Sequence, residues 1–310
     1  MADVEIISKF TESGVKVVGV AGLGLIGGSF AKAFKKYSDA KILGCDTDKE
    51  VLKDALEEGV LDGELTEENI SECDLIIPAL YNQAVIDFVK KMATHIKQDA
   101  IVMDTGGLKR RICKECFPIA QQYGFTFIGG HPMAGKKYSG YRYSSSKLFR
   151  DASMIIVPED VYDITMLEKI KNMLSPCYFG RITICTPEKH DKLIAFTSEM
   201  AHIVSNAYIK SPTAREHKGF SAGSYKDMTR VAWLNEDMWT EIFMENKDNL
   251  IYELDTIMGF LQEYKDALVN EDSEKLHAVT VEQSCIPHRV TLHLAIERGF
   301  WVTDIVTVEI

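Results

Sequence analysis

The feature that most constrains the fold is a glycine-rich turn after an apolar segment near the start of the chain. The segment runs from Val17 to Phe30, and Gly22, Gly24 and Gly27 have the spacing G-x-G-x-x-G. In dinucleotide-binding folds the first glycine permits a tight turn and the second leaves room for a pyrophosphate. The third lets the following helix pack closely against the strand. The sequence therefore predicts a strand, a glycine turn and a helix that together bind a dinucleotide.

The start of this helix is the expected phosphate-binding position, because the first N–H groups of a helix are unpaired and its dipole is positive there. We assign Leu25 and Ile26 to this role together with the three glycines. A second apolar segment, from Lys41 to Cys45, leads into Asp46, where this motif carries the acid that binds the ribose hydroxyls. A carboxylate there repels a 2′-phosphate, so the sequence predicts NAD rather than NADP as the cofactor.

Short apolar segments alternate with helical patterns through the first part of the chain. This alternation predicts an α/β, Rossmann-like domain whose parallel sheet is covered by helices on both faces. The expected strands are 15–21, 41–45, 75–79, 100–103, 126–128, 154–157 and 177–184, and the expected helices are 49–58, 83–95 and 108–123.

The pattern changes after Thr186-Pro187, where apolar residues begin to recur three and four positions apart, as in helices. The segment 211–226 is rich in Gly and Ser and is expected to be a loop. We therefore divide the chain into a dinucleotide-binding domain, residues 1–185, and an all-α domain, residues 186–310. The second domain ends in a short tail from Pro287 with β-like residues and no assigned role.

The composition favours a cytoplasmic globular protein. A formal net charge of −11 argues against nonspecific binding to nucleic acid or to anionic membranes. No apolar run is long enough to span a bilayer, and the first residues carry acids where a signal peptide would carry bases. The cysteines are expected to be thiols, with Cys113 and Cys116 as small residues on a helix face. No spacing demands a metal ion.

Three polar clusters carry residues suited to chemistry. His131 lies just past a predicted strand, and a histidine can take a proton from a substrate hydroxyl near neutral pH. His190 and His202 lie in a helical pattern further along the chain. Arg230 could bind a carboxylate through two hydrogen bonds. Each of these residues alone is ordinary, and only their combination is informative.

Together these segments resemble the prephenate dehydrogenases of tyrosine biosynthesis, over roughly residues 15–265. The matching blocks are Gly22 to Ser29, His131 to Gly135, His190-Asp191, and Gly223 to Arg230. The resemblance implies that the protein oxidises prephenate with NAD and releases CO2, which yields 4-hydroxyphenylpyruvate.

The resemblance also implies roles for individual residues. His131 would take the proton of the ring hydroxyl, and Arg230 would hold a substrate carboxylate. The remaining substrate-binding positions would be His202, Gly223 and His190. The helical domain would bind the small-molecule substrate and pair with a second copy of the chain to form a homodimer.

Three positions depart from the family pattern. Gly107 stands where a serine often bonds the catalytic histidine, so Thr105 or a water is expected to hold His131 instead. Lys137 replaces a common acid, and Glu199 replaces a common histidine. Glu199 could pair with the ammonium group of arogenate, which keeps arogenate dehydrogenase as an alternative. A 3-hydroxy-acid dehydrogenase and a catalytically inactive NAD-binding relative are further alternatives.

Overall fold

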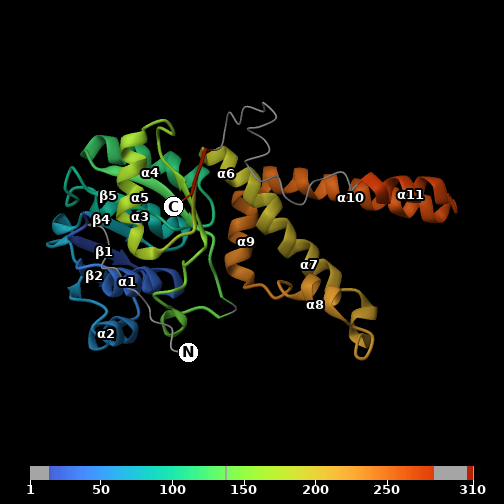
Figure 1. Cartoon of the computed structure of the whole chain (residues 1–310), viewed down its shortest axis with the longest axis horizontal. Coiled ribbons are helices and arrows are strands. Elements are labelled where there is room, and N and C mark those ends of the chain that lie inside the picture. Colours follow the sequence, from blue (N-terminus) through green and yellow to red (C-terminus); the bar gives the residue numbers. More distant parts are fainter. Residues whose placement is uncertain (1–13, 137, 283–305, 310) are drawn as a thin grey trace. The chain divides into compact units, whose positions relative to one another are not determined.

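The structure is a computed structural model that describes residues 14–136, 138–282 and 306–309. The described chain divides into two units between His190 and Asp191, and the first unit also takes in residues 306–309. Figure 1 shows that the first unit is a sheet with helices on both faces and that the second consists of helices. The predicted combination of an α/β domain and an all-α domain is confirmed.

Within the described residues, the first unit contains a nine-stranded sheet with the order β3-β2-β1-β4-β5-β6-β7-β8-β9. The strands are β1 (Val17–Ala21), β2 (Lys41–Cys45), β3 (Gly63–Glu64), β4 (Leu75–Pro78), β5 (Ile101–Met103), β6 (Thr126–Pro132), β7 (Ser153–Val157), β8 (Arg181–Ile184) and β9 (Val306–Glu309). Only the short β3 lacks a predicted counterpart in the first half of the chain.

The predicted parallel pairing is confirmed from β3 through β6, whereas β7 runs antiparallel to β6. A parallel strand would need a crossover connection from the carboxyl end of β6 back to the amino end of the sheet. Among its described residues, the β6–β7 connection contains only the 3-10 turn η2 (Tyr141–Tyr143), so β7 starts at the same end of the sheet at which β6 finishes and runs antiparallel to it. Strand β6 also continues to Pro132, and His131 therefore lies within the strand rather than after it.

Strand β9 pairs antiparallel with β8, which is itself parallel to β7. This pairing places residues 306–309 in the first unit, although the sequence predicts 186–310 as a single helical domain. The backbone of β9 pairs with the outer side of β8, so β8 is not left as an unpaired edge strand. The rest of the tail from Pro287 lies outside the described residues.

Helices pack on the two faces of the sheet and form two apolar cores. Along β4, Leu75 and Ile77 join the core beneath α1, α2 and α5, and Ile76 joins the core beneath α3 and α4. These helices are α1 (Leu25–Tyr37), α2 (Lys49–Glu57), α3 (Asn82–Met92), α4 (Arg110–Tyr123) and α5 (Ile164–Met173), with the 3-10 turns η1 (Ile70–Glu72) and η3 (Ser175–Cys177).

The two cysteines of the C-x-x-C pattern lie buried on the inner face of α4, as predicted for small residues on a helix face. Cys113 and Cys116 belong to the core beneath α3 and α4 and are thiols. Burial raises the pKa of Cys116 to about 12, so it is protonated at neutral pH.

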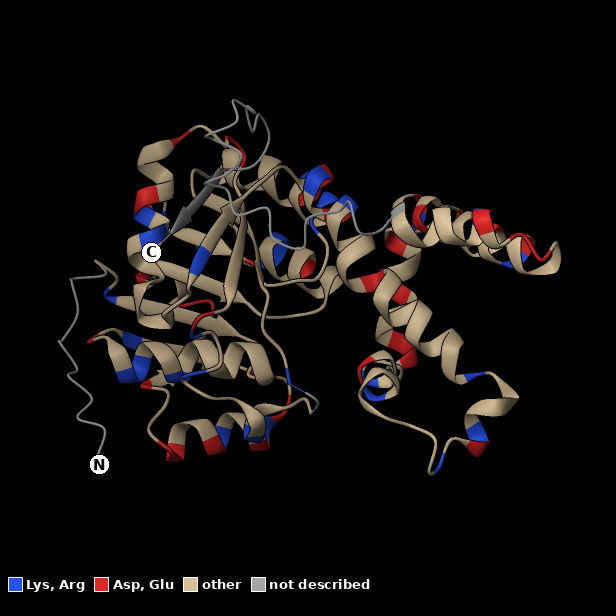
Figure 2. Ribbon diagram, turned by 45° about the vertical axis from the view of Figure 1, so that its right-hand side comes forward, with Lys and Arg blue, Asp and Glu red and all other residues tan. Residues whose placement is uncertain are grey.

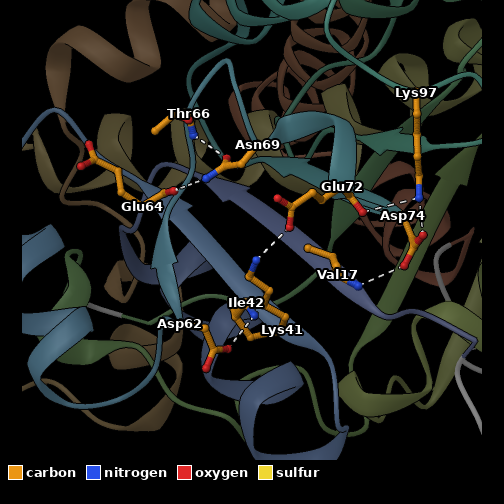
Figure 3. Close-up of polar contacts among 10 residues, drawn as sticks. All are labelled: Val17, Lys41, Ile42, Asp62, Glu64, Thr66, Asn69, Glu72, Asp74 and Lys97. Atoms are coloured by element: carbon orange, nitrogen blue, oxygen red, sulfur yellow. Dashed lines mark hydrogen bonds and ion pairs between the residues drawn. The ribbon is translucent and has the colours of Figure 1, made fainter.

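Charged side chains fasten the amino ends of β1, β2 and β4 (Figure 3). The carboxylate of Asp74 accepts a hydrogen bond from the Val17 N–H at 3.0 Å and from Lys97 Nζ at 2.5 Å. Lys41 Nζ donates to Glu72 at 2.8 Å. These contacts join the amino ends of the strands. The glycine turn lies at the opposite end of the sheet, after the carboxyl end of β1.

The second unit follows the predicted helical pattern. Its elements are the end of α6 (Pro187–Ile194), the π-helical segment η4 (Ala195–Met200), α7 (Ala201–Ile209), the 3-10 segment η5 (Pro212–Glu216), α8 (Gly223–Thr229), α9 (Glu236–Glu245), α10 (Lys247–Val269) and α11 (Ser273–Glu282). The loop expected at 211–226 is therefore wrong in part. Pro212 lies in the first turn of η5, where its missing N–H has no intrahelical partner to lose.

Acidic and basic side chains are interspersed along the helices of both units (Figure 2). Even the 23-residue α10 follows this pattern. None of the helices that the structure describes is long and apolar enough to cross a membrane.

Candidate functional site

The glycine turn lies between the carboxyl end of β1 and the start of α1. Gly22 has a φ of +85°, and a Cβ at this position would lie 2.5 Å from the carbonyl oxygen of Ala79. A Cβ on Gly27 would lie 1.8 Å from the carbonyl oxygen of Gly22. The tight turn and the close approach of helix to strand both exist, and both require these two glycines.

Gly24 differs from its two neighbours in the motif. A Cβ there would meet nothing within 4 Å, and its φ of −65° is open to any residue. Gly24 is the N-cap of α1, whose first turn contains Leu25 and Ile26 and carries no acidic residue. The free space and the N–H groups of the helix start fit an approaching phosphate group.

Asp46 follows β2 directly and lies close to the glycine turn. Its Oδ2 accepts the N–H of Leu23 at 2.6 Å, and its Oδ1 accepts the N–H of Asp48 at 2.9 Å. Asp46 and Gly22 both line a cavity of about 530 Å³ at this end of the sheet. A fixed carboxylate beside a glycine turn fits the ribose and phosphate groups of a dinucleotide.

His131 meets His190 in the same unit. His131 lies on β6 opposite Ile155, and its Nδ1 is 2.9 Å from Nε2 of His190 on α6. His190 is 1% exposed, whereas His131 is partly exposed. Burial lowers the pKa of His131 well below 6.5, and His190 and Lys109 lower it further. His131 is therefore neutral near pH 7 and can act as a base.

A buried ion pair lies beside this histidine. Asp104 and Lys109 are both fully buried, and Lys109 Nζ donates to Asp104 Oδ2. The same carboxylate accepts the N–H groups of Gly106 at 2.7 Å and Gly130 at 3.0 Å. The pair ties the turn after β5 to β6 at the residue before His131. The sequence analysis noted the missing serine at Gly107 in this turn but did not predict the ion pair between Asp104 and Lys109, although the turn begins with an acid and ends with a base.

The contact on His131 differs from the expected one. His190, and not Thr105, lies against Nδ1 of His131. Lys137 lies outside the described residues. Within the described residues, no group of three His, Cys, Asp or Glu side chains is arranged to hold a metal ion.

In the second unit, the structure brings His202, Arg230 and Trp239 together. Nδ1 of His202 lies 2.9 Å from the carbonyl oxygen of Val231, and its ring centroid is 4.1 Å from that of Trp239. Burial lowers the pKa of His202, and the charge of Arg230 lowers it further. Neutral His202 donates from Nδ1 to Val231, so its Nε2 can accept a hydrogen bond. Arg230 is exposed at the end of α8.

A mainly apolar cavity of about 640 Å³ lies beside this group and has Trp239 in its wall. Cavities of this size with a few polar groups are typical of small-molecule sites. Gly223 begins α8, and a Cβ there would meet nothing within 4 Å. The backbone of the second unit therefore does not itself require a glycine at this position.

Glu199 does not offer a free carboxylate. It is fully buried in η4, and its two carboxylate oxygens accept hydrogen bonds from Asn246 Nδ2 at 3.0 and 3.1 Å. Asn246 is equally buried and also donates to the carbonyl oxygen of Asp191. The structure thus gives Glu199 a role in packing α10 against η4, which differs from the expected pairing with a substrate ammonium group.

Comparisons with known proteins match the chain to two family descriptions. Residues 30–184 match "Prephenate dehydrogenase, nucleotide-binding domain", and residues 186–282 match "Prephenate dehydrogenase, dimerization domain". The chain is similar to the prephenate dehydrogenase of Bacillus subtilis (strain 168), with 30% identity over 83% of this chain and 71% of the relative. It is 27% identical to the cyclohexadienyl dehydrogenase of Zymomonas mobilis, over 84% of this chain and 91% of the relative.

The fold is similar to a solved structure of prephenate dehydrogenase from A. aeolicus in complex with hydroxyphenyl propionate and NAD+. The TM-score is 0.76 at 27% identity, and the match covers 87% of this chain and 96% of the other.

Proposed function

The chain belongs to the prephenate dehydrogenase family of oxidoreductases, and from this premise we propose that it catalyses the NAD-dependent oxidative decarboxylation of prephenate to 4-hydroxyphenylpyruvate. The observation that carries the proposal is His131, which is neutral and lies in the unit that contains the glycine turn. Equal amounts of NADH, CO2 and 4-hydroxyphenylpyruvate formed from prephenate would test it. NADH without CO2 would count against it.

The chemistry assigned to this chain is removal of one proton. His131 accepts the proton of the ring hydroxyl at Nε2 as the carbon–oxygen double bond forms, and the ring becomes aromatic when the carboxyl group leaves as CO2. A neutral imidazole suits this step because it takes up positive charge as the hydroxyl loses its proton.

The cofactor would be held by the glycine turn and by Asp46. Gly22, Gly24 and Gly27, with the N–H groups of Leu25 and Ile26, form the phosphate-binding part of this assignment. Bound NAD+ supplies the acceptor for the hydride that leaves the ring carbon bearing the hydroxyl. The solved A. aeolicus relative contains NAD+, which supports the assignment.

Replacing Asp46 by asparagine is expected to lower the preference for NAD over NADP by at least about tenfold in kcat/KM, because the charge that repels a 2′-phosphate is lost. Asparagine keeps an oxygen that can accept the N–H of Leu23. The matched control is Asp39→Asn, which removes an exposed charge shortly before the first residue of β2. An unchanged ratio in the Asp46 variant would exclude this carboxylate from cofactor selection.

Substrate binding is assigned to the group around Arg230. Its guanidinium would pair with a carboxylate of the dianionic substrate, while His202 and the backbone at Gly223 complete the polar wall. The ligand in the A. aeolicus relative, hydroxyphenyl propionate, has a hydroxylated ring and a carboxylate, as this assignment requires.

Replacing Arg230 by alanine is expected to raise the KM for prephenate by roughly 10- to 100-fold, with a smaller effect on kcat, because a charge-assisted hydrogen bond to the substrate is lost. Steady-state rates at saturating NAD would measure both constants. Arg215→Ala, another exposed arginine of the second unit, is the control and should leave KM unchanged. A normal KM in the Arg230 variant would remove this residue from the substrate site.

Prephenate is preferred over arogenate in this proposal because the arogenate alternative depended on Glu199. That carboxylate is buried and bonded to Asn246, so it is not available to an ammonium group. A 3-hydroxy-acid dehydrogenase falls outside the matched family.

The homodimer is proposed through the helical part of residues 186–310, with residues 1–185 binding NAD. Several large apolar side chains of α10 are exposed in the single chain, including Tyr252 at 63%, Met258 at 54% and Leu261 at 59%. Exposed apolar patches of this kind commonly mark protein–protein contacts. The matched family description for this part of the chain, a dimerization domain, supports the same assembly.

A further inference from the structure

We propose that His190 is a positioning residue that holds His131 in the tautomer able to accept a proton, an inference that rests on the proposed role of His131 as the base. The sequence resemblance assigns His190 to substrate binding. The geometry instead directs its Nε2 at Nδ1 of His131, at 2.9 Å, with the two ring centroids 5.1 Å apart.

Only one hydrogen can lie between the two facing nitrogens. If His131 is to accept the substrate proton at Nε2, its own hydrogen must lie on Nδ1 and be donated to His190 Nε2. His190 then carries its hydrogen on Nδ1 and is neutral. When His131 takes the substrate proton, this hydrogen bond persists and becomes charge-assisted, which stabilises the imidazolium. A base oriented by a third group in this way is a recurring catalytic arrangement.

The opposite arrangement would disable the base. If Nε2 of His190 carried the hydrogen, Nδ1 of His131 would have to accept it, and the hydrogen of His131 would move to Nε2, where the substrate proton should go. Protonation of His190 would have this effect.

Burial works against protonation of His190, and the charged groups nearest the pair are of both signs. Lys109 faces His131 from the turn after β5, with its charge balanced by Asp104, and His190 is almost fully enclosed. A positive charge on His190, in addition to that of Lys109, would be costly at this buried position. On α6 itself, the buried Asp191 follows His190 directly.

Two substitutions separate positioning from packing. His190→Gln retains a side-chain oxygen that can accept the hydrogen bond from His131, and His190→Leu fills a similar space without any acceptor. Thermal unfolding and NAD affinity of the two variants show whether each is folded. The tautomer of His131 can be read in the NAD-bound protein from its ring 15N chemical shifts, since the chain has 8 histidines and His131→Asn identifies the signal.

We expect Nδ1–H in the wild type and in His190→Gln, and a shift toward Nε2–H in His190→Leu. The kcat for prephenate should fall at least roughly tenfold in the leucine variant, with little change in KM, and the glutamine variant should recover most of this loss. An unchanged tautomer in His190→Leu, or equal losses of kcat in both folded variants, would overturn the proposal. The 15N measurement needs no turnover, so a wild type inactive on prephenate would refute the proposed function without deciding the tautomer.

Discussion

Replacing His131 by asparagine is expected to lower kcat for prephenate by roughly two to four orders of magnitude, because the variant retains a polar side chain but no group that can take the hydroxyl proton. The KM for prephenate and the affinity for NAD should change little, since neither is assigned to this residue. Steady-state kinetics and a titration with NAD would measure the three quantities.

The control for this variant is His95→Asn, which changes an exposed histidine of the same unit and should leave kcat unchanged. The pH profile adds an independent test. The pKa of His131 lies well below 6.5, so the kcat/KM of the wild type should be constant near pH 7 and should fall only as the pH drops through that lower value. A kcat within about threefold of the wild type in His131→Asn would exclude His131 as the base.

Replacing Lys109 by methionine is expected to lower the free energy of unfolding of the first unit by roughly 3–5 kcal/mol, because it leaves the carboxylate of Asp104 charged and without its partner in a fully buried position. The N–H groups of Gly106 and Gly130 still bond that carboxylate but do not neutralise it. Urea unfolding followed by circular dichroism would measure the loss, with the two units fitted as separate transitions.

Two further variants identify the cause of this loss. Lys41→Met breaks the exposed ion pair between Lys41 and Glu72, in which the two side chains are 47% and 50% exposed, and should cost much less stability than Lys109→Met. The double variant Asp104→Asn with Lys109→Met should recover part of the loss, because no buried charge is left unpaired. If Lys109→Met were no more costly than Lys41→Met, the buried pair would have no special importance for stability.

The parts of the fold that the sequence predicted are those with local causes. Strand β2 begins and ends at the predicted residues because its apolar run is short and bounded by turns. The conformation of Gly22 and the close packing at Gly27 follow from the glycine spacing alone. Strand β6 was predicted too short, because residues beyond Ile128 become a strand only through pairing with β7.

The contacts of the candidate site depend on residues far apart in the sequence. His131 and His190 are separated by 59 positions, and neither flanking sequence specifies that the two rings meet. Glu199 was considered in the sequence as a partner for a substrate ammonium group, but the structure buries it. Its burial depends on Asn246, which is 47 positions away. The sequence identified each of these residues as a candidate, but it did not predict which residue each would contact.

The most direct test of the proposed function is the kcat/KM of the purified protein for prephenate and for arogenate, measured side by side as NADH formation with NAD. We expect efficient oxidation of prephenate and a lower kcat/KM for arogenate, since the carboxylate of Glu199 is already bonded to Asn246. Oxidation of arogenate alone would refute prephenate as the substrate. Binding of NAD without turnover of either substrate would also contradict the proposed function, and would identify the protein as an inactive member of its family.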